Sequence, residues 1–506
     1  MMILVILLLI LAASLLFLFH RRKTVQKSPP PPGPRGLPFI GSILQLDPAA
    51  PHIYLWKLSL KYGPLMSMKL GSVPVIVVSS SDIAKQVLKT HDLVFSSRPK
   101  LLGQHKLFYK GLDVAFAPYS DSWRETRKIC VVHLLSIKRV QSFRPTREEE
   151  VSRMVTNLSA GSGRVANLTA VMLDLTSTLI CRVAFGKERD EGESRMRSRF
   201  DELMIESQAV QAGFAFVSDY LPWFGWVDRL NGMIAKLDRV FKDLDDFLEE
   251  LIQQHLDPNR PKSKNPNILE LLIQLKNENS SSLALTWDHV KAILMDIFVA
   301  GTDTGAATVI WAMTALIKNP ETMKRLQKEM SELVGERRQV DEDDLAKLPY
   351  LSAVVKEALR LFPPAPLLLP RESIQSCNIN GYAIPAKTLV FVNAWAIARD
   401  PNSWENPDEF VPERFLNSGI DVIGTDFEVI PFGAGRRGCP GIAMGLATVE
   451  LALANLVHSF HWELPPGITK EDIDTQVSPG LTMHKKNPLC LMPISRYTVD
   501  HKNSHH

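Results

Sequence analysis

The sequence predicts a mainly α-helical domain with small β-sheets, preceded by one N-terminal transmembrane helix. Three observations predict this class: an uncharged apolar run at residues 1–19, one clear β-hairpin at 65–79, and helical patterning through most of the rest. The 506 residues are 45% hydrophobic and 22% charged, a globular composition that argues against disorder and fibrous structure. We expect an anchor at 1–20, a basic and proline-rich hinge at 21–42, and one large domain at 43–506.

The apolar run at the N-terminus predicts an uncleaved membrane anchor. As a helix, its nineteen residues would be about 28 Å long, close to the thickness of the bilayer's hydrocarbon core. A cleaved signal peptide normally begins with basic residues, whereas here the basic cluster at 20–23 follows the run. The positive-inside rule then places the N-terminus in the lumen and the remainder in the cytosol.

The cysteines and glycosylation motifs bear on the same topology. Five cysteines without paired spacing indicate thiols in a reducing compartment, with no disulfide framework or structural zinc site. Three N-x-S/T motifs begin at Asn157, Asn167 and Asn279, and they would be glycosylated only if the body were luminal. We expect them to remain unmodified.

The balance of charge argues against nucleic acid as a partner. The chain carries 58 Lys and Arg against 55 Asp and Glu, a formal net charge of +3. So small an excess provides no whole-protein field to attract a polyanion.

The remaining elements follow in chain order. Consecutive prolines at 28–42 favour a stiff, extended spacer, and Gly71-Ser72 marks the turn of the hairpin. The clearest helix begins after Thr286, a good N-cap, and stops before Asn319-Pro320, about 48 Å further on. It is apolar on nearly all faces around Ile297–Val299, which predicts burial. Because burying unpaired polar groups is costly, the polar stretch Gly301–Thr304 in its middle indicates partners or a function for these residues.

Residues 207–228 combine aromatic and aliphatic side chains between helical stretches. Two interpretations stay open. The segment is either core, or a second membrane contact in which Trp223 and Trp226 act as interfacial anchors.

The most informative stretch is PFGAGRRGCPG at 431–441. It contains a formal G-x-G-x-x-G, but no βαβ pattern surrounds it and Cys439-Pro440 interrupts it, so a dinucleotide loop is disfavoured. A thiolate loop is the alternative: Gly435 and Gly438 let the backbone turn around one sulfur, and Arg437 supplies a nearby cation.

These residues resemble a known family. Phe432, Gly435, Arg437, Cys439 and Gly441 match F-x-x-G-x-R-x-C-x-G, and this pattern is similar to the haem-binding loop of the cytochrome P450 superfamily. The resemblance implies the cytochrome P450 fold, and haem b with Cys439 as the axial iron ligand. It also implies electrons from NADPH through a membrane-bound reductase, with cytochrome b5 as an optional second partner.

Three further motifs agree in their order along the chain. In the resembled family, an E-x-x-R pair (here Glu357 and Arg360) forms a buried structural triad with the arginine of PERF, here Arg414. The stretch AGTDT crosses the distal haem face: Gly301 would make space for dioxygen, Thr304 would hydrogen-bond it, and Asp303 would relay protons from solvent. The haem propionates would be held by Trp123, Arg127, Arg98, Arg371 and Arg437.

The sequences PPGPRGLPFIG, AGTDT, PERF and FGAGRRGCPG are similar to those of plant microsomal members of the largest plant clan, which includes a branch with aldoxime-metabolising enzymes. By position, the substrate pocket would be lined by Phe298, Val299, Ala300, Ala365, Leu367, Leu368, Leu481 and Thr482. These residues are mainly apolar, which favours a small lipophilic substrate.

The resulting prediction is an oxygen- and NADPH-dependent monooxygenase of the endoplasmic reticulum. It would hydroxylate a small terpenoid, alkaloid or phenolic/indolic metabolite, and the reductase would dock on a basic face around Arg436. The same chemistry could instead serve desaturation, oxidative coupling, cyclisation or aldoxime oxidation. A non-enzymatic haem sensor or membrane scaffold is the alternative from another class, and the pair Asp303–Thr304 argues against it.

Overall fold

The computed structural model describes residues 28–186, 191–211, 215–260, 265–278 and 283–497. The anchor predicted at 1–20 and the motif at Asn279 therefore lie outside the described residues.

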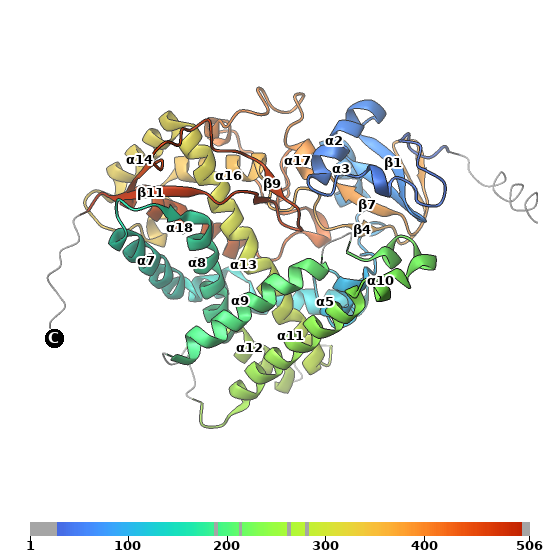
Figure 1. Ribbon diagram of the computed structural model, residues 1–506, viewed down its shortest axis with the longest axis horizontal. Coiled ribbons are helices and arrows are strands. Elements are labelled where there is room, and N and C mark those ends of the chain that lie inside the picture. Colours follow the sequence, from blue (N-terminus) through green and yellow to red (C-terminus); the bar gives the residue numbers. More distant parts are fainter. Residues whose placement is uncertain (1–27, 187–190, 212–214, 261–264, 279–282, 498–506) are drawn as a thin grey trace, which may run out of the picture.

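Helices make up most of the described chain; β1, β7 and β4 lie at one end of the molecule and β11 lies at the other (Figure 1). The α-helices are α2 (Pro51–Tyr62), α3 (Ser81–Lys85), α4 (Leu102–Leu107), α5 (Asp121–Ile129), α6 (Ile137–Ser142), α7 (Arg144–Ala160), α8 (Leu168–Phe185), α9 (Glu191–Gln211), α10 (Val227–Leu230), α11 (Met233–Leu256), α12 (Ile268–Glu278), α13 (Trp287–Lys318), α14 (Pro320–Val334), α15 (Glu342–Leu345), α16 (Pro349–Leu361), α17 (Ala394–Ile397) and α18 (Ile442–Ser459). Shorter 3-10 and π turns are η1 (Ile43–Gln45), η2 (Gln86–Thr90), η3 (Cys130–Leu134), η4 (Val217–Asp219), η5 (Pro222–Phe224), η6 (Pro412–Phe415) and η7 (Gly435–Arg437).

The strands form four small sheets. The largest has the order β1-β2-β7-β4, in which β2 and β7 are parallel and the other two pairs are antiparallel. The others pair β10 with β9, β5 with β6, and β11 with both β3 and β8. Their bounds are β1 (Leu65–Leu70), β2 (Val73–Val78), β3 (Ala166–Asn167), β4 (Arg371–Glu372), β5 (Cys377–Ile379), β6 (Tyr382–Ile384), β7 (Leu389–Val392), β8 (Phe460–Glu463), β9 (Val477–Ser478), β10 (His484–Lys485) and β11 (Cys490–Ser495).

Helix α13 runs through the centre of the fold, and its predicted ends are confirmed. Thr286 is the N-cap and forms a reciprocal capping box with His289, which satisfies two of the free N–H groups at the helix start. Asn319 ends the helix and Pro320 begins α14. Among the described residues, three helices, α8, α13 and α18, are long and apolar enough to cross a membrane, but half or more of each apolar window is buried inside this fold, which explains their composition.

The predicted hairpin is also confirmed, as β1 and β2 with the turn at Gly71-Ser72. The proline-rich segment lies against this end of the molecule. The amide of Ser67 donates to the carbonyl of Pro32 over 2.8 Å, and that of Ala383 donates to Pro29 over 3.0 Å. Residues 29–42 are therefore part of the folded body, and a free spacer would have to lie before them.

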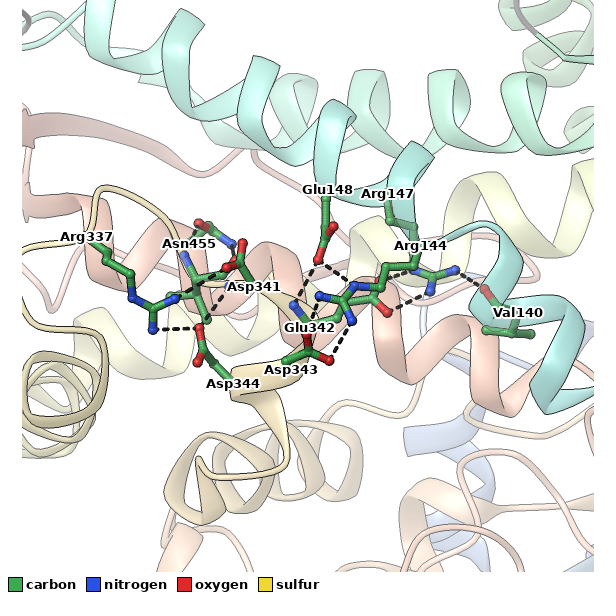
Figure 2. A network of polar contacts seen from close by, with 11 residues as sticks. Val140, Arg144, Arg147, Glu148, Arg337, Asp341, Glu342, Asp343, Asp344 and Asn455 are labelled. Carbon is green, nitrogen blue, oxygen red and sulfur yellow. Dashed lines mark hydrogen bonds and ion pairs between the residues drawn. The ribbon is translucent and has the colours of Figure 1, made fainter. Parts of the chain in front are cut away.

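A polar network supports the helix that follows the cysteine loop (Figure 2). Arg147 of α7 is buried and donates to both carboxylate oxygens of Glu342, at 2.5 and 2.9 Å. Its guanidinium also lies 3.3 Å from the sulfur of Met444 in α18. Asn455 of α18 exchanges two hydrogen bonds of 3.0 Å with the backbone of Val340. The segment between α14 and α16 thereby joins α7 to α18 and fixes the position of α18.

Candidate functional site

The cysteine loop lies between β7 and α18 in the chain and is closed by backbone contacts. The amide of Cys439 donates to the carbonyl of Phe432 over 2.9 Å. Gly435 has φ +69°, and a Cβ there would lie 2.1 Å from the carbonyl oxygen of Leu88. Because no side chain can occupy that space, glycine is required for the loop to pack against η2.

Cys439 lies near the end of this loop, three residues before α18. The residue is exposed, yet protein surrounds it closely enough that burial raises the pKa of its thiol, so it faces a space within the fold. The amide of Gly441 donates to the sulfur at 3.4 Å, and Arg127 lies near, and both favour the thiolate.

The middle of α13 is also accessible, although the helix is buried on either side. Residues 290–295 and 306–316 are buried, whereas 299–305 are half-buried or exposed. The expectation of burial around Ile297–Val299 holds for Phe298 and is wrong for its two neighbours, which are half-buried. The polar stretch therefore borders a space, which explains why polar residues occur in the middle of an otherwise apolar helix.

The three polar positions of this stretch differ in their contacts. The hydroxyl of Thr304 donates to the carbonyl of Ala300 over 2.8 Å, so its oxygen is left to act as an acceptor. Asp303 lies 2.7 Å from the imidazole of His484, described below. The hydroxyl of Thr302 is buried without a partner among the described residues, while its carbonyl accepts from Thr176 at 2.6 Å.

Gly301 is required for the packing of two helices. A Cβ at this position would lie 2.3 Å from the terminal carbon of Ile180 in α8. The missing side chain thus permits close packing of α8 against α13, and the expected role of making space for dioxygen stays a prediction. Sequence gave no signal for Ile180, because it lies 121 positions earlier in the chain.

Guanidinium groups from separate segments converge beside the cysteine loop. Arg98 donates to the carbonyls of Ala115, Leu369 and Pro370, and Arg437 donates to those of Ser96, Val114 and Ala117. Arg371 makes longer bonds of 3.2 and 3.4 Å to Ala434 and Phe95, and Arg127 donates to Gly438 over 2.7 Å. The indole of Trp123 lies under Arg437, with 3.7 Å between the guanidinium carbon and the ring centre, and it donates to Val114.

Positive charge is concentrated there. Burial first, and then the neighbouring guanidinium groups, lower the pKa of Arg98 and bring that of Arg437 to about 9. The nearby carboxyl of Asp113 is a weak counter-charge, because burial raises its pKa to about 6. The arrangement suits a ligand that brings carboxylates of its own.

Asp113 and Asp296 form a buried pair that sequence reasoning missed. Asp296 of α13 accepts from the amides of Val114 and Ala115 at 2.6 and 3.3 Å, which fixes residues 113–116 against the helix. Burial and the adjacent Asp113 raise the pKa of Asp296 well above its ordinary value. An acid within the apolar run of α13 was the signal that could have found it.

The structure brings Glu357, Arg360 and Arg414 together. Arg360 donates to both oxygens of Glu357, at 2.7 and 2.8 Å, and Arg414 donates to one of them at 3.1 Å. Glu357 and Arg360 are fully buried, and Arg360 also donates to the carbonyls of Ala398, Pro407 and Glu409. All of these contacts are within the scaffold, which fits the structural role expected of the triad.

The predicted pocket residues divide between clusters. Phe298, Val299 and Leu481 belong to one apolar cluster, beside Leu369. Leu367 packs instead against β1 and β2, and Leu368 packs near the cysteine loop, with its Cδ1 3.8 Å from the Cβ position of Gly433. Ala300 is exposed, Ala365 is half-buried and Thr482 is buried.

Comparison with known families decides the identity of the fold. The family model for cytochrome P450 matches residues 31–492. The chain is a cytochrome P450. The match includes the cysteine loop, the buried triad and α13, so the resemblance of the motifs is confirmed at the level of the family.

Relatives and solved structures agree. The 5-OH-xanthotoxin synthase of Pastinaca sativa is 51% identical over 471 residues, covering 91% of this chain and 92% of the relative. The 6,7,8-trihydroxycoumarin synthase of the same plant is 50% identical with the same coverage. A zebra fish cytochrome P450 structure with progesterone has a TM-score of 0.74 and 25% identity, covering 88% of this chain and 99% of that one. This P450 is a plant-type haem-thiolate monooxygenase that uses O2 and electrons from a reductase to hydroxylate specialised metabolites.

The site fits haem b, the cofactor of this family. An accessible cysteine with an N–H directed at its sulfur can supply the axial thiolate. The cluster of Arg98, Arg371, Arg437 and Arg127 can pair with carboxylates on the rim of the group.

Proposed function

We propose that this P450 hydroxylates a flat aromatic metabolite of the coumarin type. Two relatives, identical to this chain at about half of their positions, carry names that describe coumarin chemistry, and this observation supports the class most directly. The apolar cluster of Phe298, Val299 and Leu481 offers the kind of surface on which an uncharged aromatic ring can pack. The aldoxime, terpenoid and alkaloid substrates are alternatives that the same experiment separates.

We propose that each site residue has one task. Cys439 would ligate the iron, and Arg98, Trp123, Arg127, Arg371 and Arg437 would hold the propionates, while Phe432 and Gly435 shape the loop. When bound, the haem supplies an iron centre that activates dioxygen, and thiolate donation favours O–O cleavage. Thr304 has an oxygen free to accept a hydrogen bond, and Asp303, which lies in the accessible stretch of α13, would relay protons to the site.

The test uses microsomes from yeast that express the full chain together with a plant reductase. Xanthotoxin, umbelliferone, a monoterpenol, an indole alkaloid and an aldoxime are titrated separately while the haem absorption band is recorded. We expect a low-to-high-spin shift and an NADPH-dependent hydroxylated product with a coumarin. A shift and product with another class alone would overturn the substrate assignment. Cys439→Ser is the control, because it should abolish the thiolate spectrum.

The membrane arrangement is a second part of the proposal. Residues 1–20 would anchor the chain in the endoplasmic reticulum with its body in the cytosol. Residues 21–42 would connect this anchor to the catalytic domain at 43–506, with 29–42 packed against that domain. An apolar patch, the tryptophan patch, would make a second contact; it comprises Phe39, Leu44, Trp223, Phe224, Trp226 and Leu230, all exposed. Hydrogen bonds from Ser72 to the carbonyl of Tyr220 and from Ser42 to that of Lys69 connect its two halves.

Flotation with vesicles of microsomal lipid tests the patch. A chain lacking residues 1–23 should still float in part, and Trp223→Ser with Trp226→Ser should abolish this binding. Ile468→Ser is the matched control, since Ile468 is exposed and apolar but lies between β8 and β9. Equal flotation of all three proteins would contradict the second contact.

The reductase contact is proposed around Arg436, with cytochrome b5 as an optional second donor. Arg436 is 40% exposed and pairs with Asp92 at 2.7 Å. Arg436→Glu should raise the reductase concentration needed for half-maximal turnover. Asp92→Asn is the control, because it removes the pair without reversing the basic charge.

A further inference from the structure

Asp303, the acid in the middle of α13, is held by a histidine from a distant part of the chain. The Nε2 atom of His484 lies 2.7 Å from Oδ1 of Asp303. The carboxyl side chain is 14% exposed and the imidazole is 27% exposed, so the histidine is the more accessible member of the pair. Nothing in the sequence marks His484, a single histidine 181 positions after its partner.

The backbone that carries His484 is fixed against α13. The indole N–H of Trp311 in α13 donates to the carbonyl of Met483 over 2.7 Å, and the amide of Met483 donates to Pro364 over 2.8 Å. His484 itself is paired with Ser478 in the small sheet of β9 and β10. Because the amide and the carbonyl of Met483 are both hydrogen-bonded, the backbone beside His484 is held in place, and the imidazole is held against Asp303.

Two lysines near His484 have partners of their own, and Lys486 is exposed. Lys485, the next residue, pairs with the carboxylate of Asp474 at 3.7 Å, and burial lowers the pKa of this lysine. Lys318, at the end of α13, donates to the carbonyls of Ile473 and Lys470. Of these basic side chains near β9 and β10, His484 is the one that contacts Asp303.

We propose that His484 is the positioning residue of proton delivery, which orients Asp303 and returns a proton to it after each transfer. This inference rests on the proposed role of Asp303 as the proton donor. A proton moves from Nε2 of the imidazolium to Oδ1 of Asp303, which leaves a neutral ring with its remaining proton on Nδ1; solvent then reprotonates Nε2, and no electrons move. Imidazole suits this task because it titrates near neutral pH, whereas lysine or arginine would retain its proton.

The first experiment measures the contact without turnover. The full chain, shown to be haem-loaded by its reduced carbon-monoxide spectrum, is treated with diethyl pyrocarbonate, and acylation of each histidine is quantified by peptide mass spectrometry. Asp303→Ala should raise the acylation rate of His484 about fivefold, because Nε2 loses its hydrogen bond. His461, an exposed histidine of β8, should react equally in both proteins. An unchanged rate at His484 would overturn the proposal.

The second experiment measures hydrogen peroxide released per NADPH consumed, with reductase and xanthotoxin, from about pH 6 to 8. His484→Gln keeps an N–H donor near Asp303 but cannot carry a proton, so it should raise the peroxide fraction severalfold and flatten its dependence on pH. His461→Gln should match the wild type.

A double variant separates positioning from a general structural effect. Because His484 acts through Asp303, His484→Gln should add nothing in an Asp303→Asn background. A wild-type peroxide fraction in His484→Gln, or additive effects in the double variant, would overturn the inference. If the wild type does not hydroxylate xanthotoxin, the proposed substrate fails, and the acylation of His484 still decides the role of the pair.

Discussion

Removing the charge of Glu357 should destabilise the fold strongly, because this carboxylate is the common acceptor of a buried network. It accepts from Arg360 at 2.7 and 2.8 Å, from Arg414 at 3.1 Å, and from the amide of Val411 at 2.9 Å. Glu357 and Arg360 are both 0% exposed, so water cannot replace the lost partner. Breaking a buried ion pair from one side costs about 3–5 kcal/mol, since it leaves the other charge without compensation.

That loss is a large part of the total free energy of unfolding. Domains are stable by about 5–15 kcal/mol, so Glu357→Gln should lower the urea midpoint clearly and reduce the yield of haem-loaded protein. Midpoints are followed by far-ultraviolet circular dichroism and by the reduced carbon-monoxide spectrum of the same samples.

The control for this experiment is an exposed pair. Glu321 and Lys324 lie 2.7 Å apart in α14 with side chains 87% and 70% exposed, so Glu321→Gln should leave the midpoint unchanged. Equal midpoints for the wild type and Glu357→Gln would refute the reasoning, because they would show that Arg360 and Arg414 find other partners at no cost.

Three further predictions concern single residues. Gly435→Ala should abolish haem loading, judged by the carbon-monoxide spectrum, because its Cβ would meet a backbone carbonyl at 2.1 Å; Gly445→Ala, with open space around its Cβ, should load normally. Gly301→Ala should lower thermal stability, and Ile180→Ala should restore it in the double variant, whereas a defect that persists would indicate a role toward the bound ligand. Burial raises the pKa of Asp113 to about 6, so the folded state loses stability as this carboxyl ionises between about pH 4 and pH 6. The urea midpoint of Asp113→Asn should therefore be higher than that of the wild type at pH 8 and equal to it at pH 4. The same difference in midpoint at both pH values would contradict this.

The elements that sequence alone determined are those set by local chemistry. The ends of α13 follow from the side chain of Thr286, which caps the first amides, and from Pro320, which cannot donate within a continuing helix. The turn at Gly71-Ser72 was equally legible. The family followed from the cysteine loop and the order of the motifs, because their spacing along the chain is itself the signal.

Tertiary structure alone decided which distant groups meet. The guanidinium groups of Arg98, Arg371 and Arg437 come from separate segments, and their shared surroundings appear only after folding. The pair of Asp303 with His484 and the contact of Gly301 with Ile180 likewise join positions more than a hundred residues apart. Periodicity and capping act over a few residues, whereas these contacts depend on how α8, α13 and the last hairpin pack together, which no local pattern encodes.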